Sequence, residues 1–261
     1  MIKKDLSVIA LVFFLTRCFF NLSTFNNLYS FLITATSIFI AILGLKLIKK
    51  DILSNKIIGV IYMIIIIYIF VIILINATMF INTNYFRYNN YIIIGLSLIG
   101  TSYIIGKDEI KTISSISEIF LFVFIIISLV AYIGLISLIK INNYSGFIAF
   151  NNISINLLPG FIIFILLYLK DDNICTGYII GVISSLLDSF LLIGCLGNKL
   201  IMSYKFPGIA VLKSLNLFHF INHLDKLLSF IYLFEYTIAL SLIINIIINI
   251  KKKIGSWYLT F

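Results

Sequence analysis

Long runs of apolar residues, each about as long as a membrane is thick, recur along the whole chain and constrain its fold most. The hydrocarbon core of a bilayer is about 30 Å thick and a helix rises about 1.5 Å per residue, so one crossing needs roughly 20 residues. Because the bilayer core holds no water, each segment must satisfy its own backbone hydrogen bonds, and runs of this length favour helices over short alternating strands. The sequence predicts an all-α integral membrane protein.

Composition supports lipid as the solvent. Of the 261 residues, 62% are hydrophobic and 11% are charged, which is more apolar side chain than one globular core could bury. We expect a single polytopic membrane domain over residues 1–261. The apolar stretch after Lys3 and Lys4 contains Arg17 and lacks a small-residue cleavage site, so we expect a retained first helix rather than a signal peptide.

The apolar runs predict about eight transmembrane helices. They are placed at 6–25, 28–48, 57–81, 90–106, 117–140, 153–170, 174–197 and 226–250. The fourth run is short and the sixth contains a proline and a glycine. Without either of these two, seven spans would remain and the termini would lie on opposite sides.

The distribution of lysine and arginine predicts the orientation. With a cytoplasmic N-terminus, the loops and ends on the inner side hold twelve lysines and those on the outer side hold six lysines or arginines. This bias predicts that both termini are cytoplasmic. The net charge of +9 is then explained by topology and by contacts with anionic lipids rather than by a nucleic-acid partner.

Three ionisable side chains fall at membrane depth: Arg17, Asp188 and Glu235. Such groups are costly in a bilayer, so each needs a partner or water. Counted along the helices, they lie roughly 17, 21 and 22 Å above the cytoplasmic boundary. We therefore predict a buried cluster in which Arg17 bridges one or both carboxylates, with one acid free to bind a proton or a cationic group of a substrate.

A second interpretation of these charges stays open, in which each lies by itself in a hydrated crevice or extends to the interface. Charge reversal separates the two. If the residues form a cluster, combining Arg17→Asp with Asp188→Arg or Glu235→Arg restores expression or activity that the single changes abolish.

Two other segments carry candidate features. Pro159 and Gly160 could break the sixth span and expose backbone groups to a ligand, as in discontinuous transporter helices, or could begin a helix with proline in its first turn. Residues 198–225 predict an extracellular loop with an amphipathic helix, which either covers a site as a lid or lies on the lipid head groups.

No catalytic or metal-binding constellation is evident in the sequence. It contains no phosphate-binding glycine loop and no nucleophile with an evident base partner. His219 and His223 are four residues apart and Asp225 follows them, but a third convergent ligand is not evident. We therefore expect neither an enzyme nor a bound cofactor or metal.

Two groups of motifs carry a family resemblance. The first is Gly106-Lys107-Asp108-Glu109-Ile110 followed by Ser117-Glu118-Ile119, and the second is Phe206-Pro207-Gly208, Leu212-Lys213-Ser214-Leu215, Phe220-Ile221, Leu224-Asp225 and Tyr232. They resemble the glycine-acid stretch, the serine-glutamate pair and the extracellular segment of the spore-germination permeases. These are the B-type subunits of germinant receptors, in the amino acid/polyamine/organocation transporter superfamily.

The chain also departs from that family. His223-Leu224-Asp225 stands where the family has arginine-X-glutamate, and the family's arginine is missing from the first motif. Thr16-Arg17-Cys18-Phe19 carries no glycine break in the first helix. Family members have ten helices in two inverted five-helix repeats, whereas about eight are predicted here, which implies a shortened permease-like bundle.

The resemblance implies a membrane permease. Spans one, six, seven and eight would surround a midplane site for an amino acid or similar small polar solute, with other germinant receptor subunits as partners. We expect a ligand carboxylate near Arg17 and its amine near Asp188 or Glu235. The alternative is a non-transporting membrane subunit that anchors or assembles a partner protein, with the charges holding the helices together.

Overall fold

Helices make up the protein. The computed structural model describes residues 2–22, 25, 27–47, 56–85, 90–148, 157–169, 171–204, 206–214 and 224–258, and no strand occurs in them. The elements in chain order are α1 (Ile2–Asn21), α2 (Leu28–Leu47), α3 (Lys56–Tyr85), α4 (Tyr91–Gly106), α5 (Ile110–Ile136), η2 (Ile141–Tyr144), α6 (Ser145–Ile148), η3 (Pro159–Phe161), α7 (Ile162–Leu169), α8 (Ile174–Leu196), α9 (Asn198–Ser203), α10 (Pro207–Ser214) and α11 (Leu224–Tyr258).

Four helices in the described part are long and apolar enough to cross a membrane: α3, α5, α8 and α11. The apolar stretches of α1, α2, α4 and the η3–α7 segment are shorter. This set agrees with an all-α membrane protein. Each predicted span overlaps one of these elements. The total of eight crossings stays a prediction.

The predicted ends of the fifth span are wrong. We expected 117–140, whereas α5 begins at Ile110 and the chain leaves the helix after Ile136. The added first turns bury Ile113 and Ser114 against the rest of the bundle. A helix continues for as long as its backbone bonds and its packing are satisfied, so the edge of an apolar run does not mark its end.

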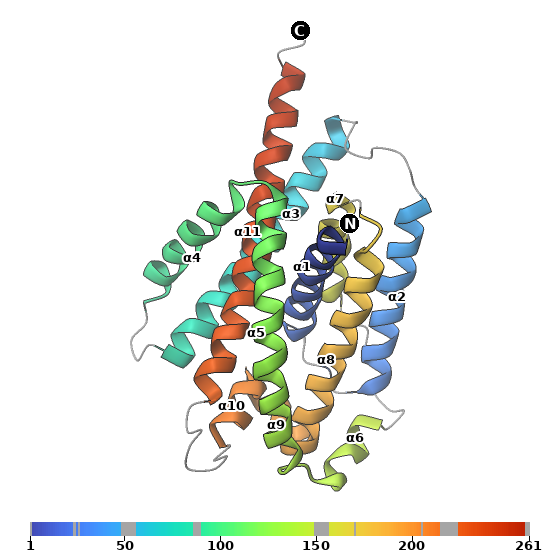
Figure 1. Ribbon diagram of the computed structural model, residues 1–261, viewed down its shortest axis with the longest axis vertical. Helices are drawn as coiled ribbons and strands as arrows, with labels where there is room; N and C mark the ends of the chain where they lie inside the picture. The colour runs from blue at the N-terminus through green and yellow to red at the C-terminus, as the bar shows by residue number, and fades with distance from the viewer. Residues whose placement is uncertain are drawn as a thin grey trace.

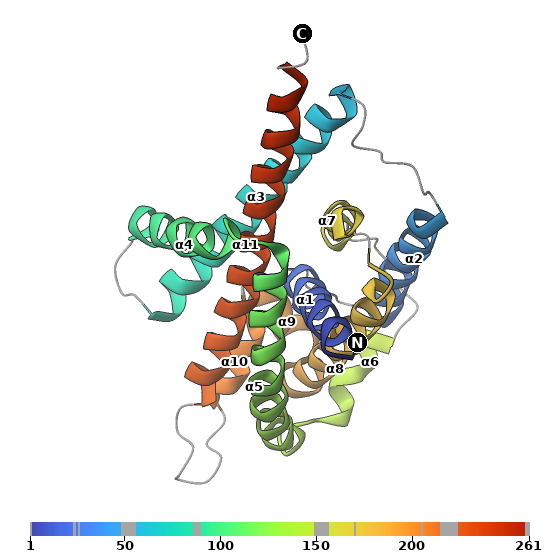
Figure 2. The same ribbon diagram turned by 45° about the horizontal axis from the view of Figure 1, so that its top comes forward.

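The first helix lies at the centre of the bundle. Figures 1 and 2 show α1 between α5 and α11 on one side and α2 and α7 on the other, and it packs against α5, α7, α8 and α11. Every residue from Ala10 to Phe20 is at most 3% exposed. By contrast, α4 and α5 turn isoleucines outward, such as Ile92 at 79% and Ile126 at 66% exposed. Such one-sided apolar exposure suits helices that face lipid, whereas α1 is surrounded by protein from Ala10 to Phe20.

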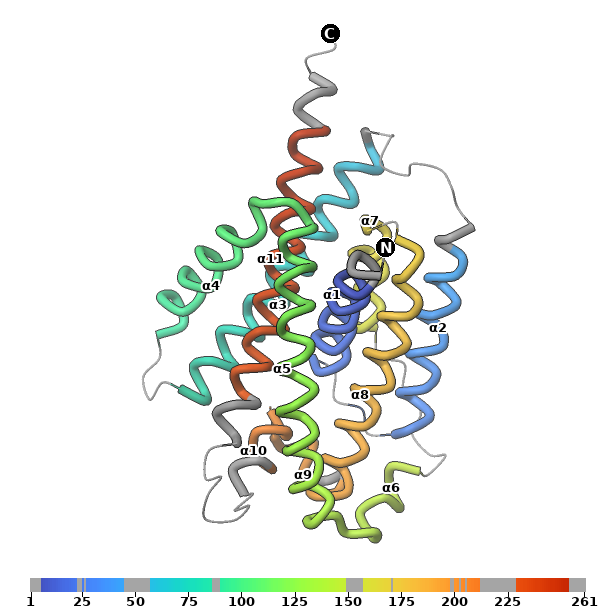
Figure 3. The backbone as a smooth tube through the Cα atoms, in the orientation of Figure 1, coloured from blue at the N-terminus to red at the C-terminus, as the bar shows by residue number. Residues whose placement is uncertain are grey.

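Three short helices, α6, α9 and α10, lie at one end of the bundle. In Figures 1 and 3, α6, α9 and α10 lie at the end opposite the C-terminus, which is marked at the top. The loop predicted at 198–225 forms α9 and α10 over its first part, and residues 215–223 lie outside the described residues. Ile209 and Val211 of α10 are buried, so this helix packs onto the bundle.

Candidate functional site

Two glycines allow α1 and α8 to touch. A Cβ atom at Gly177 would lie 2.8 Å from the carbonyl oxygen of Ile9, and one at Gly181 would lie 2.7 Å from Cβ of Thr16. Any larger residue there would collide with the opposite helix, so the two backbones meet as in other membrane helix pairs with small residues four apart. This contact places the next turns of α8 directly against Arg17.

Arg17 joins three helices through its guanidinium. Its NH1 nitrogen lies 2.7 Å from Oδ2 of Asp188, and its Nε lies 2.7 Å from Oε1 of Glu235. NH1 also donates a hydrogen bond to Oγ of Ser184 at 2.6 Å. Asp188 and Ser184 belong to α8 and Glu235 belongs to α11, so Arg17 bridges both carboxylates and the predicted clustering of the three charges is confirmed.

The Glu235 side of the cluster is closed. Glu235 is 1% exposed, and its Oε2 accepts a hydrogen bond from Nδ2 of Asn21 at 3.1 Å. The Arg17 guanidinium lies over the ring of Phe124, 4.4 Å from its centre, and Phe14 packs edge-on against that ring. Both oxygens of Glu235 therefore have a donor from α1, and aromatic rings cover the cation.

The Asp188 side of the cluster is open. Oδ1 of Asp188 accepts a hydrogen bond from the hydroxyl of Tyr132 on α5 at 2.5 Å. Its side chain is 12% exposed, compared with 2% for that of Glu235. Asp188 is also part of the wall of two hollows, a pocket with a cavity volume of about 70 Å³ and a smaller one of about 30 Å³.

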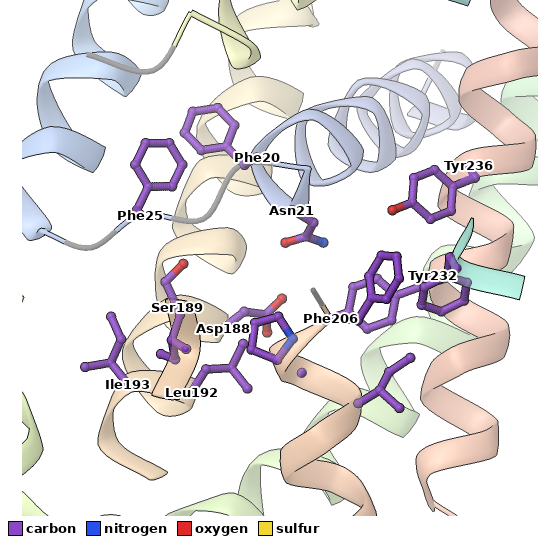
Figure 4. A pocket seen from close by; sticks show the side chains of 15 residues that line it. Phe20, Asn21, Phe25, Asp188, Ser189, Leu192, Ile193, Phe206, Tyr232 and Tyr236 are labelled. Carbon is purple, nitrogen blue, oxygen red and sulfur yellow. The ribbon is translucent and has the colours of Figure 1, made fainter. Parts of the chain in front are cut away.

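The larger pocket lies at the α9–α10 end of the bundle and is mostly aromatic. Figure 4 shows Asp188 between Phe20 and Phe25 on one side and Tyr232 and Tyr236 on the other. Its lining residues are Phe20, Asn21, Phe25, Phe80, Asp188, Ser189, Leu192, Ile193, Ile201, Phe206, Pro207, Gly208, Ile209, Tyr232 and Tyr236. The first turn of α10 thus closes one wall of the pocket, and among the described residues that line it Asp188 is the charged one.

Pro159 and Gly160 take a different position from the other predicted site residues. Both belong to η3, which leads into α7 and packs on α1 and α2. They are not among the residues that line the two hollows or pair with Arg17. Over the described residues 157–169, Pro159 stands in the first turn of the helical segment, as the second of our two interpretations expects.

The predicted histidine pair lies outside the described residues, because His219 and His223 fall in the segment 215–223. Among the residues that the structure describes, no group of three or more histidine, cysteine, aspartate or glutamate side chains could hold a metal ion.

Two partners of the charged cluster, Asn21 and Tyr132, were missed from the sequence. Asn21 stands four residues after Arg17, and Ser184, which also pairs with Arg17, stands four before Asp188. Residues three or four apart lie on one helix face, so this spacing was a usable signal. The same holds for Gly177 and Gly181, whose four-residue spacing marks a close helix contact.

No protein-family model, curated protein or solved structure matches this chain. The resemblance to the germination permeases therefore rests on the motifs of the sequence. The geometry of the site is an independent guide to function: one cation and two carboxylates give the cluster a formal charge of −1, and the open carboxylate faces a pocket.

Proposed function

We propose that this protein is a permease-like membrane protein that binds or transports a small polar solute in the pocket beside Arg17, Asp188 and Glu235. The observation that carries the proposal is the double position of Asp188, which is ion-paired to Arg17 on one side and lines the pocket on the other. The ion pair between Arg17 and Asp188 joins α1 to α8. A polar solute that contacts Asp188 changes the strength of this ion pair. Solute binding would thereby be linked to the packing of the central helix.

That linkage provides a physical basis for movement. In alternating access, one group of helices rocks against another around a central site, and a bound ligand shifts the population only through different contacts in the two states. Here α1 is the helix that α5, α8 and α11 hold in common, and its ion pairs are the contacts that a solute at Asp188 would alter. The same movement would serve a transporter or a sensor.

The proposal extends to the finer topology and setting. We propose eight crossings with both termini in the cytoplasm, on the basis of the apolar runs and the lysine bias. The motif resemblance implies a cell membrane or an inner spore membrane. Membership of the germination permease family and assembly with other receptor subunits follow from the motif resemblance. An amino acid is the solute class that this resemblance favours.

The expected pose of an amino acid needs one change. We expected its carboxylate to approach Arg17, but Arg17 is 2% exposed and both of its ion pairs lie within the protein. Its amine can approach Asp188 directly from the pocket. A ligand carboxylate would reach Arg17 only after one of the two pairs opens.

Uptake into proteoliposomes tests the proposal. Vesicles that contain the full chain should accumulate at least one radiolabelled amino acid or amine from a defined mixture, and Asp188→Asn should abolish the uptake. Glu118→Gln is the matched control, because this carboxylate lies near the start of α5 and does not line either hollow. Loss of uptake in both variants would point to general damage rather than to a solute site.

A second function is favoured because Arg17 makes both of its ion pairs within the protein. A cation whose pairs are both internal suits a structural role, in which the cluster fixes three helices and the protein anchors or assembles a partner. Absent uptake and absent ligand binding, together with stable co-purification of one partner protein from the native membrane, would establish this subunit role instead.

A further inference from the structure

The charge of the site selects for a cation. Arg17 contributes one positive charge and Asp188 and Glu235 two negative charges, so the cluster can accept a further cation without losing Arg17. Asp188 presents this excess to the pocket, while Glu235 lies behind it at 1% exposure. An anionic ligand would instead meet a carboxylate in a mostly apolar pocket, where repulsion between like charges is screened less than in bulk water.

The walls of the pocket select for an organic cation. Six aromatic side chains line it, from four separate parts of the chain: Phe20, Phe25, Phe80, Phe206, Tyr232 and Tyr236. Aromatic faces attract cations, most strongly where water is excluded, and groups of them are the recurring site for quaternary ammonium ligands. A metal ion would need converging oxygen ligands, whereas the pocket offers mainly rings and aliphatic groups around Asp188.

The surroundings of Asp188 and the rings beside it favour a methylated head group. Oδ1 of Asp188 already accepts a hydrogen bond from Tyr132, and Oδ2 is buried 2.7 Å from NH1 of Arg17. A primary ammonium has three N–H donors to satisfy, whereas a methylated ammonium needs only charge and contact with the aromatic walls.

The size of the pocket agrees with a small head group. Its cavity volume is about 70 Å³. A cavity of only about 10–15 Å³ by this measure holds one water molecule, so this one admits several waters or one compact group.

We infer that the pocket beside Asp188 binds a small methylated ammonium compound, with its cationic head between the aromatic walls and the Asp188 carboxylate. This inference rests on the proposed function, since it names the solute class of the same pocket. It goes beyond that function because it removes the need for a ligand carboxylate and makes positive charge the selected property.

Direct binding to the full chain in detergent tests the inference, with radiolabelled choline as the probe. Tetramethylammonium should displace it, and 3,3-dimethyl-1-butanol, which has nearly the shape of choline but no charge, should bind at least tenfold more weakly. Equal competition by the neutral alcohol would overturn the inference, because the pocket would then select only for apolar shape.

Two variants locate the bound head group. Asp188→Asn should weaken choline binding more than tenfold, and Phe206→Leu, which keeps apolar volume but removes the ring, should weaken it about 2- to 30-fold. The matched controls are Glu118→Gln and Phe122→Leu, since Phe122 is 56% exposed on α5 and lines neither hollow. Unchanged choline affinity in Phe206→Leu would contradict the aromatic site even if Asp188→Asn fails to fold.

The outcomes also separate this inference from the proposed function. If an amino acid binds or is taken up in an Asp188-dependent manner while choline and tetramethylammonium do not bind, the inference fails and the proposed function stands. If neither amino acids nor the two ammonium compounds bind, both fail.

Discussion

The two carboxylates that flank Arg17 have opposite surroundings. Glu235 is enclosed by α1 and the aromatic rings around Phe124, and both of its oxygens receive hydrogen bonds from α1. Asp188 has the same arginine as its partner, but the other side of its carboxylate meets a hollow at the α9–α10 end. One cluster thus has a closed half and an open half.

The difference shows how one cation can serve stability and binding together. A fully buried ion pair is held by the cost of leaving either charge unpaired, so Glu235 can hardly change partners. At Asp188 the pocket offers water or a ligand as an alternative partner, so that pair can weaken without leaving a bare charge in an apolar core. We expect variants of the closed half to act on folding and variants of the open half to act on binding.

Glu235→Ala should have the largest effect on stability. It leaves Arg17 with one carboxylate and removes the acceptor of the Asn21 hydrogen bond, in a place where Glu235 is only 1% exposed. Breaking a buried pair costs about 3–5 kcal/mol, so the free energy of unfolding, followed by SDS titration in mixed micelles, should fall by that order.

The double variant is the control for this prediction. Removing Arg17 as well should cost less than the sum of the two single changes, because each single change already breaks the Arg17–Glu235 pair. Strict additivity would mean that Arg17 and Glu235 are not energetically coupled.

Gly181→Leu should have the next largest effect, because it separates α1 from α8. A Cβ atom already meets Thr16 at 2.7 Å and the carbonyl oxygen of Phe13 at 3.1 Å, and leucine adds three further carbons. Overpacking of this kind costs about 1–3 kcal/mol, and it also moves Asp188 away from Arg17, so both stability and solute binding should fall.

Gly100→Ala on α4 gives the matched comparison, because nothing lies within 4 Å of a Cβ atom there. It should leave stability unchanged or raise it slightly, since alanine favours helix over glycine by about 0.5–1 kcal/mol. If Gly181→Leu were as harmless as Gly100→Ala, the close contact of α1 and α8 would be wrong.

Asp188→Ala should destabilise the protein less than Glu235→Ala, by about 1–3 kcal/mol, although both remove one partner of the same arginine. The reason is the hollow, which lets water replace the lost carboxylate beside Arg17. The same SDS titration measures it, and a loss equal to that of Glu235→Ala would remove the distinction between the two halves.

The helices were predictable from the sequence because long apolar runs leave few alternatives, and the charged cluster was predictable from depth. Arg17, Asp188 and Glu235 are costly at membrane depth, and a count of residues from the ends of their spans already put them at one level. What this count cannot give is rotation about each helix axis, so it left open which carboxylate would face a pocket.

The pocket itself was not predictable, because its wall combines residues from distant parts of the chain. Phe80 ends up beside Phe206 and Tyr232 only through packing of α3 on α11 and of α10 on both α8 and α11. In a chain with 24 phenylalanines and 15 tyrosines, nothing in the sequence marks these rings as special. The start of α5 was missed for a related reason, since contacts such as those of Ile113 and Ser114 extend this helix beyond the predicted apolar run.

Tyr132→Phe should have the smallest effect on stability and should separate the two halves most sharply. It removes the hydroxyl that donates to Oδ1 of Asp188, a loss of about 0.5–1.5 kcal/mol. That donor withdraws negative charge from the carboxylate, so its removal should tighten the binding of choline while stability falls. Ser184→Ala removes a partner of Arg17 instead and should lower stability by a similar amount without tightening choline binding. If the free energy of unfolding falls while choline affinity rises in Tyr132→Phe, but not in Ser184→Ala, the negative charge of Asp188 is available to a ligand. A parallel fall of both quantities in both variants would mean that Asp188, like Glu235, only holds the helices together.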